Sequence, residues 1–269
     1  MKKVLSILFA FSILATGCTP AATPVPTATA TVQPRTLTVF ADSSLTEAFT
    51  EIGTSFEAAN PGVTVKFQFG GTQTLRIQII QGGGADVFAS ASVREMTALV
   101  AALMVNKNAT QRAFATDKMV VVLPPGNPAK IQSIDGLAAP GLKLALPAET
   151  DPAGKYTRIV LKNLNATYGD GFNQKVIGNA AFNEENVRLV VDRVKAGEAD
   201  AGIVYFSDLI TAPSLVTLPI PDDVNALAEF TIAALTQSPN ADLAQKFVDF
   251  VFSNDGQTIL QQWKFGAAR

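Results

Sequence analysis

Short apolar runs alternate along the body of the chain with segments in which apolar residues recur at helical spacing. Residues 37–41 (LTVFA) form an apolar run of the kind that a buried parallel strand shows. Residues 45–56 carry apolar side chains on one helical face, and Pro61 with Gly62 ends the predicted helix. Residues 63–69 then alternate between apolar and polar positions, which predicts a half-buried strand.

The same alternation predicts the remaining elements. Strands are expected at residues 86–90, 119–123, 142–146, 175–177, 201–206, 215–220 and 230–235, and helices at 72–80, from 93, at 153–168, at 184–196, and from 239 and 255. Strands that alternate with helices indicate an α/β protein with parallel sheets. Because one sheet of so many strands is uncommon, we expect two lobes with a cleft between them.

The N-terminal part of the chain has a different pattern. Two lysines precede an apolar stretch over residues 4–14, and small residues then lead to Cys18, which together describe a secretory signal. The sequence before Cys18 resembles a bacterial lipobox, which implies removal of residues 1–17 and lipidation of the cysteine. Residues 18–35 are rich in Thr, Ala and Pro and are expected to form a disordered tether. We therefore expect a membrane-anchored lipoprotein outside the cytoplasm, with no further membrane span.

Composition and charge then narrow the function. Of 269 residues, 48% are hydrophobic and 16% are charged, so the chain can form a sizeable core. The 21 basic and 23 acidic residues give a formal charge of −2, which argues against a nucleic-acid partner. Without the two leader lysines the charge is −4. An anionic ligand would therefore need locally arranged donors, because the overall field of the protein does not attract it.

The sequence contains no histidine and a single cysteine. The first absence excludes Ser-His-Asp triads and His-dependent metal sites, and the second excludes an internal disulfide and a cysteine-cluster zinc site. Ser43 and Ser44 have no base that would activate them as nucleophiles. We therefore expect no enzymatic activity, no cofactor, and no metal beyond one carried by an oxyanion ligand.

The candidate binding positions are turns that lead from a strand into a helix. A helix N-terminus presents unpaired amide groups and a partial positive charge, so it can hold an anion without a cationic side chain. Ser44, Thr72, Ala153 and Val187 lie at four such turns, and Tyr205 closes an apolar strand. Each of these residues, taken singly, also fits a structural role such as a helix cap, a tight turn or core packing.

The motifs around these positions occur in a characteristic order. They read V-F-A-D-S-S-L-T-E-A, F-G-G-T-Q-T-L, G-A-D-V-F-A-S-A, D-P-A-G-K-Y, E-N-V-R and G-E-A-D-A-G-I-V-Y-F-S-D. In this order the chain resembles the molybdate-binding proteins of bacterial ABC importers over residues 36–269. The resemblance implies a two-lobed type II periplasmic-binding-protein (Venus-flytrap) fold with the oxyanion in the cleft. Lobe 1 would comprise residues 36–117 and 214–269, and lobe 2 residues 118–213.

The same resemblance assigns the ligand contacts. The hydroxyl groups of Ser44 and Thr72, the backbone amides of Ala153 and Val187, and Tyr205 would bind the anion. Thr72 departs from the serine of the family pattern, so either its side chain or a neighbouring amide would make the contact.

Two carboxylates lie beside these donors. We expect Asp42 and Asp151 to point outward or to cap local amides, because a carboxylate that faces a dianion would repel it. The resemblance also leaves a variant open for Asp151, because tungstate-selective relatives use carboxylates that enter the coordination sphere of the metal. A pocket of donors suits molybdate, tungstate and sulfate, whose oxygens only accept hydrogen bonds, whereas hydrogenphosphate also needs an acceptor.

The expected function is capture of molybdate, and also of tungstate, and delivery to the permease of an ABC transporter by a monomeric protein. One alternative keeps the fold and changes the ligand to sulfate, phosphate, a metal cation or an organic anion. Another keeps the ligand and makes the protein a sensor or an adhesin.

Overall fold

The computed structural model describes residues 33–107 and 112–268. Within this range, residues from Gln33 onward form one compact unit. Cys18, the predicted signal over residues 1–17 and most of the predicted tether lie outside the described residues. No helix in the described ranges is long and apolar enough to cross a membrane.

The first half of the sheet contains five strands in the order β2-β1-β3-β9-β4. Their bounds are β1 (Arg35–Asp42), β2 (Val63–Gly70), β3 (Val87–Ser90), β4 (Ala113–Leu123) and β9 (Leu227–Ala234). β1 runs parallel to β2 and β3, whereas β9 is antiparallel to both β3 and β4. The parallel strands β1 and β2 therefore end at the same edge of the sheet.

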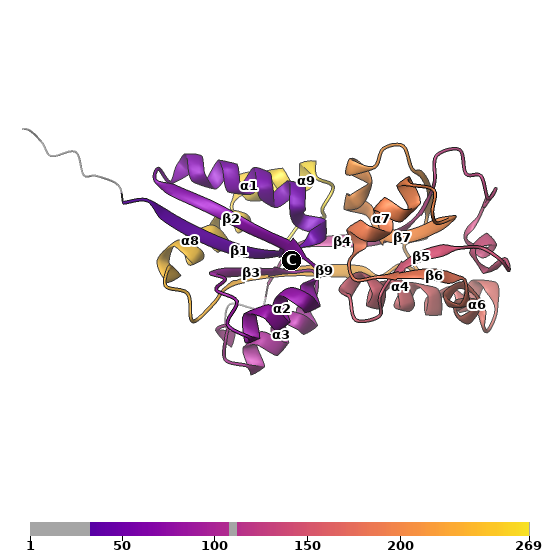
Figure 1. Ribbon diagram of the computed structural model, residues 1–269, viewed down its shortest axis with the longest axis horizontal. Helices are drawn as coiled ribbons and strands as arrows, with labels where there is room; N and C mark the ends of the chain where they lie inside the picture. The colour runs from indigo at the N-terminus through magenta and orange to yellow at the C-terminus, as the bar shows by residue number, and fades with distance from the viewer. Residues whose placement is uncertain (1–32, 108–111, 269) are drawn as a thin grey trace, which may run out of the picture. The chain divides into compact units, whose positions relative to one another are not determined.

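Helices cover both faces of this half. They are α1 (Thr46–Ala59), α2 (Thr72–Ile80), α3 (Val93–Ala101), α8 (Ala241–Phe252) and α9 (Asn254–Gln262). Figure 1 shows α1 and α9 on one side of the strands and α2 and α3 on the other. On the first face, Phe49 of α1 packs its ring near those of Phe114 and Phe247. On the second face, Leu75 and Met96 belong to a separate buried cluster.

The second half of the sheet is built on the other end of β4. The order there is β8-β4-β7-β5-β6, with β5 (Leu144–Pro147), β6 (Ala180–Glu184), β7 (Ala201–Tyr205) and β8 (Val216–Pro219). β5 runs parallel to β6 and β7, and β4 is antiparallel to β7 and β8. The helices are α4 (Pro152–Asn163), α5 (Asn165–Tyr168), α6 (Phe172–Gly178) and α7 (Val187–Lys195). Three short 3-10 helices are η1 (Ser43–Leu45), η3 (Ile134–Ala138) and η4 (Phe206–Thr211).

β4 joins the two halves into one hydrogen-bonded path of strands. Its residues up to Lys118 pair with β9, and those from Met119 onward pair with β7 and β8. The α/β class was predicted correctly, but the prediction of parallel sheets was incomplete. Since three of the strands, β4, β8 and β9, pair antiparallel with their neighbours, the sheet is mixed.

Two local predictions were wrong. The strand expected at residues 175–177 lies in α6, where Phe172 and Val176 are buried one helical turn apart, and the strand β6 begins only at Ala180. The helix expected over residues 153–168 is divided into α4 and α5 at Leu164. Neither error moves a candidate binding residue, because these residues lie at the strand ends.

Candidate functional site

All five candidate binding residues lie directly after, or at, the carboxyl end of a strand. Ser44 follows β1 in η1, Thr72 begins α2 after β2, Ala153 lies in the first turn of α4 after β5, Val187 begins α7 after β6, and Tyr205 ends β7. Each is at most 3% exposed. Because parallel strands end at a common edge, the first two residues share one edge and the last three share another.

Asp42 connects the two hydroxyl groups on the first edge. Its Oδ1 accepts hydrogen bonds from the Ser44 amide at 3.1 Å and from Ser44 Oγ at 2.8 Å. Its Oδ2 accepts from Thr72 Oγ1 at 2.5 Å, and that hydroxyl in turn accepts from the Ala91 amide at 3.1 Å. Both candidate hydroxyl groups therefore donate their single hydrogen bond to this carboxylate. The Thr72 side chain is fully buried at this edge.

Asp151 has the same relation to the second edge. It precedes α4 as its N-cap, and its Oδ1 accepts from the Ala153 amide at 2.9 Å. Burial raises the pKa of Asp151 well above its usual range, and the charge of Asp42 raises it further. Burial also raises the pKa of Asp42, although the hydrogen bonds from Thr72 and Ser44 oppose this.

The expectation for these two carboxylates was therefore half right. Both cap local amides, as the sequence suggested. The alternative expectation, that they point outward, is wrong, because Asp42 is 3% exposed and Asp151 is 2% exposed. The two carboxylates are therefore buried hydrogen-bond acceptors next to the candidate binding residues.

Arg188 brings the start of α7 to the first edge. Its guanidinium donates to the backbone carbonyl of Ser44 at 3.4 Å and to the carboxylate of Glu47. Its Nε also lies 3.2 Å from Asp208 Oδ1, as an ion pair without hydrogen-bond geometry. Val187, the neighbour of this arginine, is thereby held opposite Ser44.

Two further contacts join the edges. Gln73 Nε2 donates to the carbonyl of Glu185 at 3.0 Å. At the same place the backbone of Gly71 approaches so closely that a Cβ there would lie 2.6 Å from that carbonyl oxygen. This approach is why a side chain is excluded at Gly71.

Glu95 forms the other contact. Its carboxylate accepts from Arg76 Nε at 2.7 Å in the first half of the sheet and from Lys155 Nζ at 3.0 Å in the second. Burial acts to raise the pKa of Glu95, but the hydrogen bonds from Lys155 and Arg76 outweigh it and hold the pKa below its usual range. This group is therefore ionised and neutralised by two cations.

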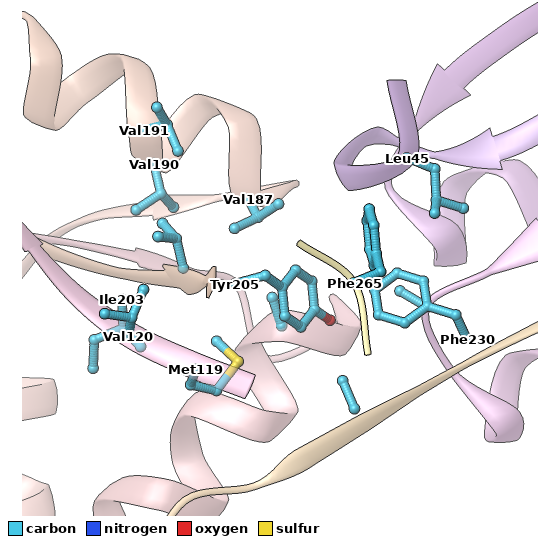
Figure 2. Packing of buried hydrophobic residues seen from close by; sticks show 14 of the residues in the cluster. Leu45, Met119, Val120, Val187, Val190, Val191, Ile203, Tyr205, Phe230 and Phe265 are labelled. Atoms are coloured by element: carbon cyan, nitrogen blue, oxygen red, sulfur yellow. The ribbon is translucent and has the colours of Figure 1, made fainter. Parts of the chain in front are cut away.

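Tyr205 reaches from β7 toward the first half of the sheet. Figure 2 shows its side chain between Val187 on one side and Phe230 with Phe265 on the other. Its ring centroid lies 5.5 Å from that of Phe230. The Tyr205 hydroxyl is buried and has no hydrogen-bond partner among the described residues. It is therefore an unused donor, whose pKa is raised well above the usual value by burial and then by the charges of Asp42 and Asp151.

Buried acids also lie behind Tyr205. Asp208 accepts from the Tyr205 amide at 3.1 Å, and Asp117 accepts from the amides of Lys118 at 2.7 Å and Ser207 at 3.3 Å. Burial raises the pKa of Asp117 to about 7 and that of Asp208 to about 8. Within the described ranges, however, no three His, Cys, Asp or Glu side chains are arranged to hold a metal ion.

The structure thus brings all five predicted residues to two edges that face each other. Sequence reasoning missed the acceptor role of Asp42 and the cross-contacts of Arg188 and Lys155. The signal was present, because Arg188 and Lys155 belong to the motifs E-N-V-R and D-P-A-G-K-Y. Their partners, however, lie 141 and 60 residues away in the chain, so spacing alone could not identify them.

Several known proteins are similar to this chain over most of its length. The molybdate-binding protein ModA of Mycobacterium tuberculosis is 38% identical over 232 residues, which cover 86% of this chain and 84% of that protein. A putative ABC transporter substrate-binding lipoprotein of Bacillus subtilis, YvgL, is 26% identical over 235 residues and 86% of each chain.

Among solved structures, the substrate-binding domain of a putative molybdenum ABC transporter from Clostridium difficile matches with a TM-score of 0.64 and 25% identity. The match covers 87% of this chain and 99% of that chain. The sequence profile described as bacterial extracellular solute-binding protein matches residues 37–266. The chain therefore belongs to the family of bacterial extracellular solute-binding proteins.

Proposed function

We propose that this protein captures molybdate outside the cytoplasmic membrane and delivers it to an ABC importer, and that it also binds tungstate. The observation that carries the proposal is the meeting of four strand-to-helix turns at two facing edges, in a chain whose relatives include ModA. A fully deprotonated tetrahedral oxyanion needs several converging donors. The proposed contacts are Ser44, Thr72, Ala153, Val187 and Tyr205.

The unused hydroxyl of Tyr205 is the strongest single support for a ligand at this place. A buried hydroxyl without a partner costs about 1–3 kcal/mol. An oxygen of the oxyanion would accept a hydrogen bond from this hydroxyl and remove that cost. The surrounding aromatic rings hold the hydroxyl in position, so the donor is oriented before the anion arrives.

We further propose that the two halves of the sheet act as lobes and that the anion favours their closed arrangement. The polypeptide would pass between lobes within β4, at Lys118 and Met119, where its pairing partners change. Because β8 pairs with the second part of β4, we propose that the chain returns to lobe 1 at β9, later than the residue 214 expected from the sequence. Contacts that a ligand makes only in the closed form shift the equilibrium toward closure.

The membrane anchor is a separate part of the proposal. Lipidation of Cys18 would hold a monomeric protein beside its permease, and YvgL, a relative, is itself described as a lipoprotein. A Cys18→Ser variant should leave the membrane fraction while its affinity for molybdate is unchanged. A variant that stays membrane-bound would contradict lipidation.

A protonated oxyanion is the second candidate, because Asp42 and Asp151 are acceptors inside the site. The O–H group of hydrogenphosphate would donate a hydrogen bond to such a carboxylate. Calorimetric titration of the purified protein with molybdate, tungstate, sulfate and phosphate separates the two. We expect sub-micromolar binding of molybdate and tungstate and much weaker binding of the others. Preferential binding of phosphate would favour the second candidate, and binding of none would exclude both.

A further inference from the structure

Three of the groups that would bind the oxyanion, and the neighbouring amide of Ser44, are already hydrogen-bonded to carboxylates of this chain. Asp42 accepts from the Ser44 amide, the Ser44 hydroxyl and the Thr72 hydroxyl, and Asp151 accepts from the Ala153 amide. These four donors come from three of the five proposed binding residues. Both carboxylates are almost completely buried, and their own charges interact.

A hydroxyl or amide proton makes one strong hydrogen bond at a time. An oxyanion that uses these four donors must therefore displace the two carboxylates from them. Among the described residues, the hydrogen-bond partners of Asp42 are hydroxyl and amide groups, and that of Asp151 is an amide. The charge of Lys155 acts to lower the pKa of Asp151, but it does not outweigh burial. Each carboxylate is therefore held by neutral donors. A dianion placed beside them would add repulsion between like charges.

We infer that Asp42 and Asp151 are internal competitors of the anion, which set the affinity and the selectivity of the site by occupying its donors. This inference rests on the proposed function and deepens it. A weakly accepting or poorly fitting anion cannot displace the carboxylates, whereas one that also engages Tyr205 and both edges can. An anion binds only if its own interactions outweigh the hydrogen bonds that the two aspartates accept. This requirement lowers the affinity for every anion and raises the selectivity.

The alternative role for Asp42 is positional. By accepting from both hydroxyl groups it could hold Ser44 and Thr72 in the orientation that the anion needs. The two roles predict opposite signs. Removal of a competitor tightens binding, whereas removal of a positioning group weakens it.

The test is a calorimetric titration of the purified full-length protein and of Asp42→Ala, Asp42→Asn and Asp151→Asn, with molybdate, sulfate and phosphate as the probes. Asp42→Ala should lower the Kd for molybdate by about tenfold or more, because two hydroxyl groups and an amide become free and a like charge is removed. Its selectivity for molybdate over sulfate should fall at the same time. The two Asn variants should shift in the same direction by a smaller factor, since a neutral amide oxygen accepts hydrogen bonds more weakly.

Asp86→Asn is the matched control. Asp86 is also a buried carboxylate that accepts from a backbone amide, that of Thr38 at 2.7 Å, but it precedes β3 at the opposite ends of the strands. Its replacement should leave the Kd unchanged. If Asp42→Ala does not fold, as judged by circular dichroism, Asp42→Asn and Asp151→Asn decide the question. Asn is as good an N-cap as Asp, so α4 keeps its first turn in the second variant.

The outcomes are distinct. Tighter binding by the variants supports internal competition, including the case in which only the variants bind an anion. Unchanged or weaker binding by folded variants of a protein that itself binds molybdate overturns the inference and leaves the proposed function intact. Absence of binding by the protein and by every variant overturns both.

Discussion

Glu95 and Asp42 are buried carboxylates near the same two facing edges, but their surroundings differ. Glu95 lies between Arg76 and Lys155, and these cations hold its pKa below the usual range despite burial. Asp42 receives only neutral donors, from Ser44 and Thr72, and burial raises its pKa. The first carboxylate is suited to hold the two halves together. The second is suited to be displaced from its donors, because the partners described for it are all neutral.

The difference shows that burial alone does not define the role of an acidic residue. A buried ion pair with two cations is costly to break, whereas a buried carboxylate with neutral partners is costly to keep ionised. The following changes test the roles of buried acids, of the close approach of the two edges and of the Tyr205 hydroxyl. They are arranged from the largest expected effect to the smallest.

Replacement of Glu95 by Ala should have the largest effect. It leaves Arg76 and Lys155 unpaired on opposite halves, and both are about three-quarters buried. We expect the free energy of unfolding in urea to fall by about 2–4 kcal/mol. Glu149→Ala is the control: this glutamate pairs with Arg158 at 3.8 Å with 81% of its side chain exposed, so its loss should change the stability by less than about 0.5 kcal/mol. An equal effect of both variants would contradict the role given to Glu95.

The pH dependence of stability should separate the two kinds of carboxylate. The pKa of Glu95 is lowered by folding, so its contribution is present at neutral pH and is lost as the pH falls below about 4. The pKa of Asp117 is raised to about 7, so the folded state is favoured at low pH, and this advantage is lost as the pH rises from about 4 through 7. Asp208, with a pKa of about 8, acts in the same direction.

Asp117→Asn tests this sign. An amide resembles the protonated acid, so the variant and the unchanged protein should have similar free energies of unfolding near pH 4. At pH 8.5 the variant should be more stable by about 1–3 kcal/mol, because it no longer buries a charge. Urea unfolding at the two pH values measures the difference. A variant that is less stable at pH 8.5 would mean that the ionised form of Asp117 is the one the fold requires.

Gly71→Ala should force the two facing edges apart. The backbone of Gly71 has φ −62° and ψ 131°, which alanine adopts without strain, but its Cβ would lie 2.6 Å from the carbonyl oxygen of Glu185. We expect the Kd for molybdate to rise about tenfold, or about 1.4 kcal/mol. Gly70→Ala is the matched control, since its Cβ would make only an ordinary contact, 3.5 Å from Leu75. Equal affinities of the two variants would show that the close approach is unimportant for binding.

Sequence patterns located the ends of β1, β2, β5 and β7 to within one residue, because both periodicity and turn residues mark them, but they missed the end of β6 before Val187. Ser44, Thr72, Ala153, Val187 and Tyr205 all lie where a strand stops, so the placement of the candidate site required no knowledge of tertiary contacts. The segment at residues 175–177 was misread because two adjacent apolar residues, Val176 and Ile177, fit either a strand or one turn of a helix.

The direction of a side chain was less predictable. An aspartate before a helix caps it whether it is exposed or buried, so the sequence around Asp42 could not distinguish the two. Its burial follows from contacts between distant segments, such as Arg188 with Ser44 and Gln73 with Glu185. The same contacts decide that the hydroxyl groups of Ser44 and Thr72 meet a carboxylate.

The smallest expected change is the most specific. Tyr205→Phe removes a buried hydroxyl that has no partner among the described residues, so the free energy of unfolding should stay constant or rise by up to about 1 kcal/mol. The Kd for molybdate should nevertheless rise about five- to tenfold, because the anion loses an oriented donor. Tyr156→Phe provides the contrast: burial raises the pKa of its hydroxyl, and the backbone of Glu229 acts to lower it. This hydroxyl interacts with the protein itself, so its loss should lower the free energy of unfolding and leave the Kd unchanged. Opposite effects of two neighbouring tyrosines, whose ring centroids are 6.5 Å apart, would locate the binding function at Tyr205. An unchanged Kd in Tyr205→Phe would instead assign this hydroxyl no part in anion binding.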